Sequence, residues 1–370
     1  MKKILIAAAL AGAAMMTSCC DKKGGITMGS LSDFDSLSYA LGANIGYGMN
    51  YEMRDVPFDY KAIDKGIKDG ALDKSDKSRE ESLDMLRKYF MTTRGERARA
   101  IARKRAQADS VRLAGGDSTK VDYPAADPEM FETEEERTDI SYAFGSDIGT
   151  NLRESGLPVE LVWIGEAMQN VRDDNAKMSQ DEANQYLQHY FMVTLPAQNA
   201  EASKAWLEKI EKKSGVKKTE SGLLYRIDKE GDATVKATDP RDVVKVHYTG
   251  RTREGKVFDT SKFANRPKEQ QEMIKKQNPE GYDKDEPVEF PLNRVIPGWT
   301  EGMQLVGKGG TITLWIPSDM AYGSRGAGRN IGPNEALEFE VELIDVTPYE
   351  EPAPADSTAT AEKPEVAPAK

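Results

Sequence analysis

The sequence predicts an α+β protein: an all-helical N-terminal half of two tandem repeats, then a twisted antiparallel β-sheet wrapped on a short α-helix. Three observations lead to this fold class. Apolar residues recur every four positions in two similar segments, which is typical of a helix with one buried face. Near the C-terminus, apolar and acidic residues alternate from Leu337 to Leu343, which indicates a half-buried strand. Pro297 has a fixed φ and no N–H, and therefore suits the first turn of a short helix.

The chain opens with two lysines, an apolar run at residues 4–16, and a pair of cysteines. Such a run is too short for a stable membrane span and is typical of a secretory signal. Cysteine directly after Met-Thr-Ser resembles a bacterial lipobox, in which the thiol is acylated and becomes the new N-terminus. We predict lipidation at Cys19, although the sequence leaves Cys20 open. The expected location is the bacterial cell envelope, in the periplasm or at the outer membrane, and the alternative is a cleaved, soluble secreted protein.

Cysteine usage and charge restrict the remaining chemistry. The two cysteines at the N-terminus are the only ones in the chain, so no disulfide is expected in the exported body. Residues 94–112 are rich in arginine, which raises the question of nucleic acid. Export and a net charge of −11 argue against that partner and favour a solvated helix face.

Residues 33–214 contain the same pattern twice. Tyr39 recurs as Tyr142 at an offset of 103 residues, and Tyr89 recurs as Tyr190 at an offset of 101. Each copy carries an apolar stripe and is too small to bury it without a partner surface. The stripe residues are Leu37, Leu41 and Ile45 in the first copy, and Ile140, Phe144, Ile148 and Leu152 in the second.

Linkers divide the chain into the following predicted parts. Residues 202–213 form a charged helix that leads into the C-terminal third, and the tail is rich in Pro, Ala and Glu and is predicted to be disordered. The predicted boundaries are a signal at 1–19, a tether at 20–33, helical repeats at 34–115 and 136–213, a linker at 116–135, a β-rich domain at 214–348, and a tail at 349–370.

The C-terminal third combines predicted strands at 243–248, 311–316 and 337–343 with a turn at 253–255. Five short motifs follow one another there: VHYTG at 246–250, FD at 258–259, VIPGW at 295–299, AYG at 321–323, and LEFEV at 337–341. They contain neither a nucleophile with its base nor a set of metal ligands, which argues against a hydrolase and a metal site. They offer an apolar aromatic pocket with two polar side chains, Asp259 and Tyr322.

In this order and spacing, the motifs resemble the FK506-binding-protein (FKBP) class of peptidyl-prolyl cis-trans isomerases over residues 214–348. The resemblance implies an isomerase without cofactor or metal, acting on proline-containing unfolded or nascent exported polypeptides and binding FK506- or rapamycin-like ligands. It implies that Trp299 is the floor of the pocket, that Tyr322 donates to a substrate carbonyl, and that Asp259 faces the twisting amide. The implied wall residues are Tyr248, Phe258, Val288, Val295, Ile296, Ile331 and Phe339.

Two departures from the family pattern bear on substrate preference. Residues 262–286 are an insertion, predicted to be a solvated loop or short helix at the pocket rim. Val288 stands where the smallest members carry an aromatic wall residue, which predicts a wider pocket. Alternatives remain for the polar side chains: Asp259 as a turn cap, and Tyr322 as a structural tyrosine. The alternative for the whole chain is a chaperone or scaffold that binds proline segments without turnover.

The helical repeats resemble the N-terminal dimerisation domain of exported isomerases such as macrophage infectivity potentiator and its periplasmic relatives. Those proteins carry one unit per chain, whereas this chain carries two. The copies are expected to pair either within one chain, as a monomeric pseudo-dimer, or between chains, as a homodimer. The linker between them raises their local concentration and favours the internal arrangement. The duplicated unit also predicts a chaperone activity that holds polypeptides near the pocket.

Overall fold

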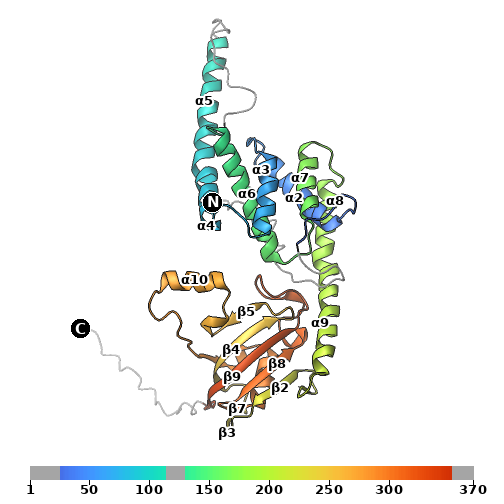
Figure 1. Ribbon diagram of the computed structural model, residues 1–370, viewed down its shortest axis with the longest axis vertical. Helices are drawn as coiled ribbons and strands as arrows, with labels where there is room; N and C mark the ends of the chain where they lie inside the picture. The colour runs from blue at the N-terminus through green and yellow to red at the C-terminus, as the bar shows by residue number, and fades with distance from the viewer. Residues whose placement is uncertain (1–25, 114–129, 352–370) are drawn as a thin grey trace, which may run out of the picture. The chain divides into compact units, whose positions relative to one another are not determined.

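The computed structural model describes residues 26–113 and 130–351 (Figure 1). The predicted signal, Cys19, and most of the tether, linker and tail lie outside these ranges. By its contacts the chain divides into two compact units. One comprises the described chain up to Leu224 together with Gly250–Asp259 and Trp315–Phe339; the other comprises Tyr225–Thr249, Thr260–Leu314 and the chain from Glu340. Within the described ranges, no helix is both long and apolar enough to cross a membrane.

The predicted helical half is confirmed, and each repeat has the same order of helices. In both, a π-helical turn follows the third helix and leads into a longer fourth one. The first repeat contains α2 (Ser36–Glu52), α3 (Tyr60–Ala71), α4 (Arg79–Lys88), the π-turn η1 (Tyr89–Thr93) and α5 (Arg94–Leu113). The second contains α6 (Glu134–Ser155), α7 (Leu161–Arg172), α8 (Gln180–His189), the π-turn η3 (Tyr190–Thr194) and α9 (Leu195–Glu211).

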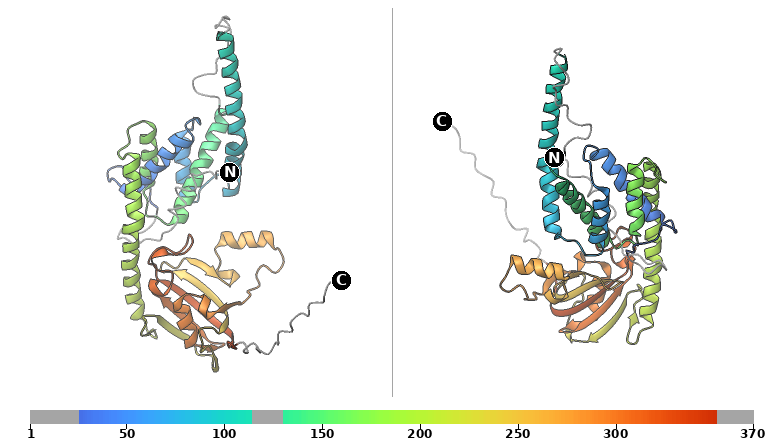
Figure 2. Two further views of the ribbon diagram at one scale, coloured as in Figure 1. Left: turned by 180° about the vertical axis from the view of Figure 1, so that it is seen from behind. Right: turned by 45° about the horizontal axis from the view of Figure 1, so that its top comes forward.

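The two repeats pair reciprocally within the chain. Helix α2 of the first repeat packs on α7 of the second, and α3 of the first packs on α6 of the second. Each repeat therefore supplies the partner surface that the other lacks. At the α3–α6 crossing the backbones approach so closely that a Cβ at Gly145 or Gly149 would collide with the carbonyl oxygen of Ile63 or Ile67. Figures 1 and 2 show α6 alongside α5. Arg97 of α5 and Glu136 of α6 form an ion pair between the two helices, with 2.8 Å between nitrogen and oxygen.

Matching hydrogen bonds mark the symmetry of this pairing. The amide of Asp59 donates to the hydroxyl of Ser141 at 3.0 Å, and the amide of Glu160 donates to the hydroxyl of Ser38 at 2.8 Å. Asp59 and Glu160 are the residues that precede α3 and α7, so the same backbone position contacts the opposite repeat in both directions. The repeated tyrosines behave in the same way: the backbone amide of Asp76 donates to the hydroxyl of Tyr142 at 3.2 Å, and that of Lys177 donates to the hydroxyl of Tyr39 at 2.7 Å.

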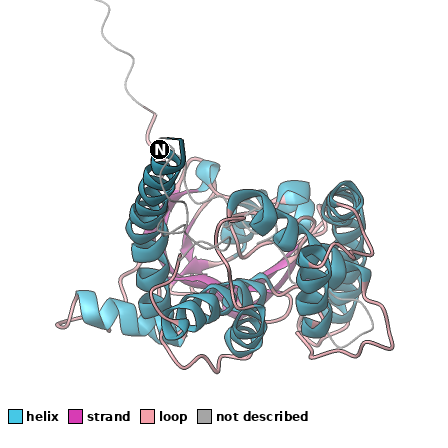
Figure 3. Cartoon of the chain, turned by 90° about the horizontal axis from the view of Figure 1, so that it is seen from above, coloured by secondary structure: helices cyan, strands magenta, loops and turns pink. Residues whose placement is uncertain are grey.

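The C-terminal third forms a seven-stranded sheet in the order β1-β2-β8-β9-β4-β5, with β6 paired to β4 (Figure 1). The strands are drawn in magenta in Figure 3. Its strands are β1 (Lys217–Lys218), β2 (Leu224–Lys229), β4 (Val243–Thr252), β5 (Val257–Thr260), β6 (Val288–Pro291), β8 (Thr311–Ile316) and β9 (Leu337–Thr347). A separate two-stranded sheet pairs β3 (Asp232–Lys236) with β7 (Gly307–Lys308). The helices of this region are α10 (Lys268–Gln277) and α11 (Pro297–Gly302).

The predicted elements are confirmed, with three adjustments to their bounds. The strand expected at 243–248 continues to Thr252, directly before the predicted turn, and the strand expected at 337–343 continues to Thr347. Gly255 takes the positive φ of 84° that the turn requires. The charged helix expected from residue 202 begins earlier, at Leu195. Pro196 lies within its first turn, directly after the π-helical turn η3.

Candidate active site

Two aromatic rings pack around Trp299, the residue predicted as the pocket floor. Tyr248 of β4 and Phe290 of β6 stand nearly perpendicular to the indole, with centroids 5.4 and 5.6 Å away, and 5.7 Å from each other. Pro297 begins α11, so the short helix holds Trp299 in its first turn, and the side chain is only 4% exposed. Edge-to-face pairs of this kind contribute about 0.5–1.5 kcal/mol each beyond burial, which makes the cluster rigid.

Sequence reasoning missed Phe290. The signal for it was the alternation Val288-Glu289-Phe290, which places Val288 and Phe290 on one face of the edge strand β6. β6 runs antiparallel to β4, with Val288 opposite Val246. The predicted wall residue Val288 is exposed, whereas its neighbour on the same face supplies the aromatic contact to Trp299.

A second aromatic pair lies over Gly250 of β4. Phe258 of β5 and Phe339 of β9 meet at 5.5 Å between centroids and 87° between planes. A Cβ on Gly250 would lie 2.7 Å from an atom of each ring. The glycine of the VHYTG motif is therefore the one residue type that leaves room for both rings.

The two predicted polar side chains lie in the same compact unit as this pair and interact electrostatically. Asp259 follows Phe258 on β5 and is exposed. Tyr322 immediately precedes the short 3₁₀ turn η8 (Gly323–Arg325) and is 38% exposed. Burial raises the pKa of Tyr322, and the negative charge of Asp259 raises it further. The phenol therefore stays protonated, as a hydrogen-bond donor must.

The other predicted wall residues lie on several different elements. Ile331 is buried, and its loop is closed by two backbone hydrogen bonds with Ala327. Val295 and Ile296 are half-buried and lead into α11. The predicted site residues divide between the two compact units. One unit contains Tyr248, Val288, Val295, Ile296 and Trp299, and the other contains Phe258, Asp259, Tyr322, Ile331 and Phe339. The strands β5, β4 and β9 that carry Phe258, Tyr248 and Phe339 are neighbours in the sheet.

The insertion at 262–286 is folded and anchored beside Tyr248. At its root, the hydroxyl of Thr260 donates to the carbonyl of Tyr248 at 2.9 Å and approaches the hydroxyl of Thr249 at the same distance. Asn265 donates to the Thr249 hydroxyl at 2.8 Å. Farther out, the rings of Phe263 and Tyr282 pack at 5.2 Å and close the insertion on itself. The predicted short helix is present as α10.

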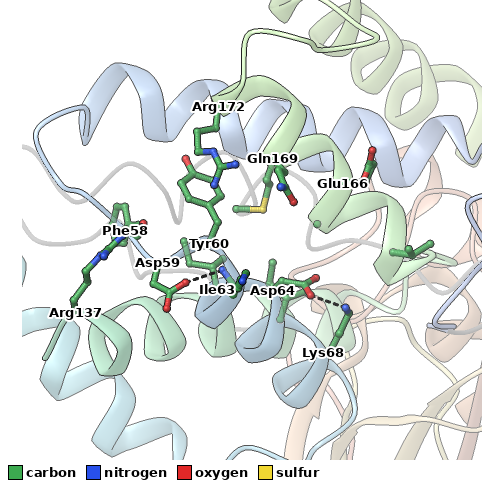
Figure 4. Close-up of a pocket in the computed structure, with 15 residues that line it drawn as sticks. Phe58, Asp59, Tyr60, Ile63, Asp64, Lys68, Arg137, Glu166, Gln169 and Arg172 are labelled. Carbon is green, nitrogen blue, oxygen red and sulfur yellow. Dashed lines mark hydrogen bonds and ion pairs between the residues drawn. The ribbon is translucent and has the colours of Figure 1, made fainter. Parts of the chain in front are cut away.

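A separate cavity of about 620 Å³ lies in the helical half, between α3 and α7 (Figure 4). The guanidinium of Arg172 lies over the ring of Tyr60 at 4.6 Å, and Asp64 pairs with Lys68 at 2.5 Å. Sequence reasoning assigned none of the residues around it to a functional site, because they belong to the repeat pattern and to no catalytic motif. Among residues 26–113 and 130–351, no group of three or more His, Cys, Asp or Glu side chains is placed to hold a metal.

Comparison with known proteins agrees with these observations. The family model described as FKBP-type peptidyl-prolyl cis-trans isomerase matches residues 235–344. A probable isomerase of this type, FkpA from Neisseria meningitidis serogroup B, is 39% identical over 235 residues, which cover 58% of this chain and 78% of that protein. The chain belongs to the FKBP-type peptidyl-prolyl cis-trans isomerases. This isomerase therefore assists protein folding by interconverting prolyl peptide bonds in proline-containing substrates.

Two further relatives extend the likeness. The FKBP-type 22 kDa isomerase of Escherichia coli is 37% identical over 215 residues, covering 56% of this isomerase and 93% of that protein. The outer membrane protein MIP of Legionella longbeachae is 30% identical over 218 residues, covering 56% and 84%. These similarities indicate a periplasmic or other envelope location. A second family model, the domain amino terminal to FKBP-type isomerases, matches this chain twice, at residues 34–115 and 137–227.

Proposed function

We propose that the prolyl ring of the substrate binds against Trp299, that Tyr322 donates to a substrate carbonyl, and that Asp259 faces the twisting amide. In this proposal the pocket is lined by Tyr248, Phe258, Val288, Val295, Ile296, Ile331 and Phe339. The observation that supports it is the raised pKa of Tyr322, because burial and then the charge of Asp259 keep the phenol protonated as a donor. FK506-like ligands are expected to compete for the same site.

The chemistry follows from the amide bond. Rotation breaks amide resonance and meets a barrier of about 18–20 kcal/mol. The twisted transition state has a less polar carbonyl than either planar isomer, so an apolar site favours it over both ground states. An acceleration of about 10⁶-fold requires about 8 kcal/mol of such preference. No covalent intermediate is needed, in keeping with a site built from rings and two polar side chains.

Exchange spectroscopy on a short Xaa-Pro peptide tests these roles with the full-length isomerase. Trp299→Ala and Tyr322→Phe are each expected to lower the catalysed exchange rate, the first by removing the floor and the second by removing one donor. Tyr51→Phe is the control, because Tyr51 is an exposed tyrosine of the helical half. Unchanged exchange in both pocket variants would assign catalysis to other residues, and no exchange in the folded parent protein would favour a chaperone that binds without turnover.

The paired repeats support a monomer in which the dimerisation surface is satisfied inside one chain. Both reciprocal crossings, α2 with α7 and α3 with α6, are made by a single copy. Light scattering on the delipidated protein is expected to give the mass of one chain. A mass of two chains that persists on dilution would reject the internal arrangement in favour of a homodimer.

The helical half is also proposed to hold unfolded polypeptides. Met91 of η1 and Met192 of η3 occupy equivalent positions and are both exposed. Flexible thioether side chains adapt to varied apolar partners. Replacing both by Gln should weaken suppression of aggregation of a proline-free client, whereas Met273→Gln on α10 should not. Equal suppression by all three proteins would contradict a role for these methionines.

Anchoring to the membrane by a lipid on Cys19 completes the proposal. Its support is the lipobox-like sequence before the cysteine, which lies outside the described residues. Metabolic labelling with a radioactive fatty acid is expected to mark the parent protein and the Cys20→Ala variant, but not Cys19→Ala. Label retained in Cys19→Ala would show that the fatty acid is attached to a residue other than Cys19.

A further inference from the structure

Helix α9 contacts the loop that carries Tyr322 and Ile331 through a buried polar cluster, here called the α9 clamp. Polar side chains from α9, from the turn after β4 and from the approach to β9 meet in it. Its members are Asn199, Ser203, Arg253, Asn334 and the backbone of Ala336. All of them lie in one compact unit with Tyr322. None was nominated from the sequence, because the partners come from three distant segments.

Ser203 is at the centre of the clamp and is only 5% exposed. Its hydroxyl donates to the carbonyl of Asn334 at 2.9 Å and accepts from the amide of Ala336 at 3.0 Å. It also accepts from the guanidinium of Arg253 at 3.0 Å. One buried hydroxyl thus joins the helix to the loop before β9 and to the turn after β4.

Asn334 also forms a hydrogen bond with Gly323, the residue that follows Tyr322. Its backbone amide donates to the carbonyl of Gly323 at 2.8 Å, and its side chain donates to the carbonyl of Pro196 at 3.1 Å. Its φ of 57° lies in the left-handed region, where asparagine is one of the better tolerated residues. The loop is therefore fixed between the first turn of α9 and the peptide that follows Tyr322.

Arg253 fixes the neighbouring turn to the same place on the helix. Its guanidinium donates to the backbone carbonyl of Asn199 at 3.2 Å and to that residue's side-chain oxygen at 3.3 Å, and its side chain is 3% exposed. This turn leads into β5, which carries Phe258 and Asp259. The clamp thus connects to one helix both the loop that bears Tyr322 and the turn that leads into the strand of Asp259.

The helix is a firm support for these loops. Ile210 near its end packs with Leu224 and Trp315 in a small apolar core. Leu195 at its start is fully buried in the core of the helical repeats. Because both ends of α9 are held, a change at Ser203 is expected to move the loop and not the helix.

We propose that Ser203 is a positioning residue for isomerisation, acting through Asn334 to place the hydroxyl of Tyr322 for the substrate carbonyl. The inference rests on the role proposed above for Tyr322. In this proposal Ser203 does not contact the substrate. It holds in place the loop whose Tyr322 contacts the substrate. A serine that only stabilised the fold would leave the interaction of Tyr322 with substrate unchanged.

The test is a double-mutant cycle on kcat/KM for a short Xaa-Pro peptide, with the full-length protein. Ser203→Ala is expected to lower kcat/KM by about tenfold, which corresponds to about 1.4 kcal/mol of transition-state binding. In a Tyr322→Phe background the same substitution should have almost no further effect, because the donor it positions is gone. Asn334→Gly keeps the left-handed backbone but removes the bond to Pro196, and should show the same dependence on Tyr322.

Ser141→Ala is the matched control. Ser141 is also a buried serine whose hydroxyl takes a backbone N–H, from Asp59, but it lies in the helical repeats. It should leave kcat/KM unchanged in both backgrounds. Effects of Ser203→Ala and Tyr322→Phe that simply add, or a Ser203→Ala enzyme with full activity, would overturn the positioning role while leaving Tyr322 in place. No effect of Tyr322→Phe alone would overturn both this inference and the role proposed for Tyr322.

Discussion

Asp64 of α3 faces Gly165 of α7, and the two residues occupy the same position in the two repeats. A Cβ on Gly165 would lie 2.5 Å from a carboxylate oxygen of Asp64, which also pairs with Lys68. If both repeats carried aspartate here, two carboxylates would meet. The duplicated chain has become asymmetric at the point where its copies face each other, and this asymmetry favours pairing between unlike repeats.

The Gly165→Asp variant tests this relationship. It is expected to lower the free energy of unfolding by about 1–3 kcal/mol, because it overfills the contact and opposes two like charges. Adding Asp64→Gly should restore most of the lost stability, since the aspartate and the glycine have then only exchanged places between the two repeats. Gly48→Asp is the control, because a Cβ at Gly48 meets nothing within 4 Å. Urea unfolding followed by circular dichroism makes the measurement; equal losses at both glycines would refute the proposed contact.

The backbone crossing of α3 and α6 gives a second prediction. A Cβ at Gly145 would collide with the carbonyl oxygen of Ile63, which cannot rotate away as a side chain can. Gly145→Ala is therefore expected to cost at least about 2 kcal/mol of stability. At helical positions with room for a Cβ the same change is favourable, and a Cβ at Gly48 meets nothing within 4 Å. Gly48→Ala should therefore add about 0.5–1 kcal/mol. A stable Gly145→Ala protein would show that the helices do not cross as described.

The pKa of Tyr322 predicts the alkaline behaviour of the enzyme. Burial and the charge of Asp259 both disfavour the phenolate, so the donor persists above the ordinary pKa of about 10. The associated stability is present below the pKa of the unfolded chain and is lost as the pH rises through the folded pKa. Asp259→Asn should shift the alkaline fall in kcat/KM to lower pH, and Tyr322→Phe should abolish that fall. An alkaline limb that persists in Tyr322→Phe would belong to another group.

The helix caps of the two repeats should respond alike. Ser78 caps α4 and Ser179 caps α8, and each forms a reciprocal capping box with the glutamate three residues on, Glu81 or Glu182. Each Ser→Ala change is expected to cost about 1 kcal/mol, with a range of 0.5–2. Unfolding measured in urea at neutral pH checks the magnitude, and a loss in only one repeat would contradict their equivalence.

The same caps have a defined pH dependence. Hydrogen bonds from the side chain and backbone of Ser78 lower the pKa of Glu81, and bonds from the backbone and side chain of Ser179 lower that of Glu182. A lowered folded pKa contributes stability above the unfolded pKa that is lost as the pH falls through the folded value. The difference between parent and Ser→Ala proteins should therefore shrink in acid. A constant difference down to pH 2 would exclude the carboxylates from the caps.

Local patterns in the sequence predicted the elements of this protein well. The stripe from Leu37 to Ile45 became α2, and the alternation around Phe339 became β9, because burial of one face imposes a fixed period on a helix or strand. The motifs also pointed to Trp299, which does lie in an aromatic cluster. Phe290 was missed, because a single aromatic on a short edge strand gives little periodic signal.

The sequence by itself determined the fold class, the duplication and the isomerase family, since these depend on residue order and short-range periodicity. Tertiary structure alone decided which repeat packs on which helix, that Gly165 meets Asp64, and that Ser203 lies between Arg253 and Asn334. These partners are distant in the chain and belong to no repeating pattern. Their meeting depends on how whole helices and strands pack, so the contacts become visible only after the packing itself is known.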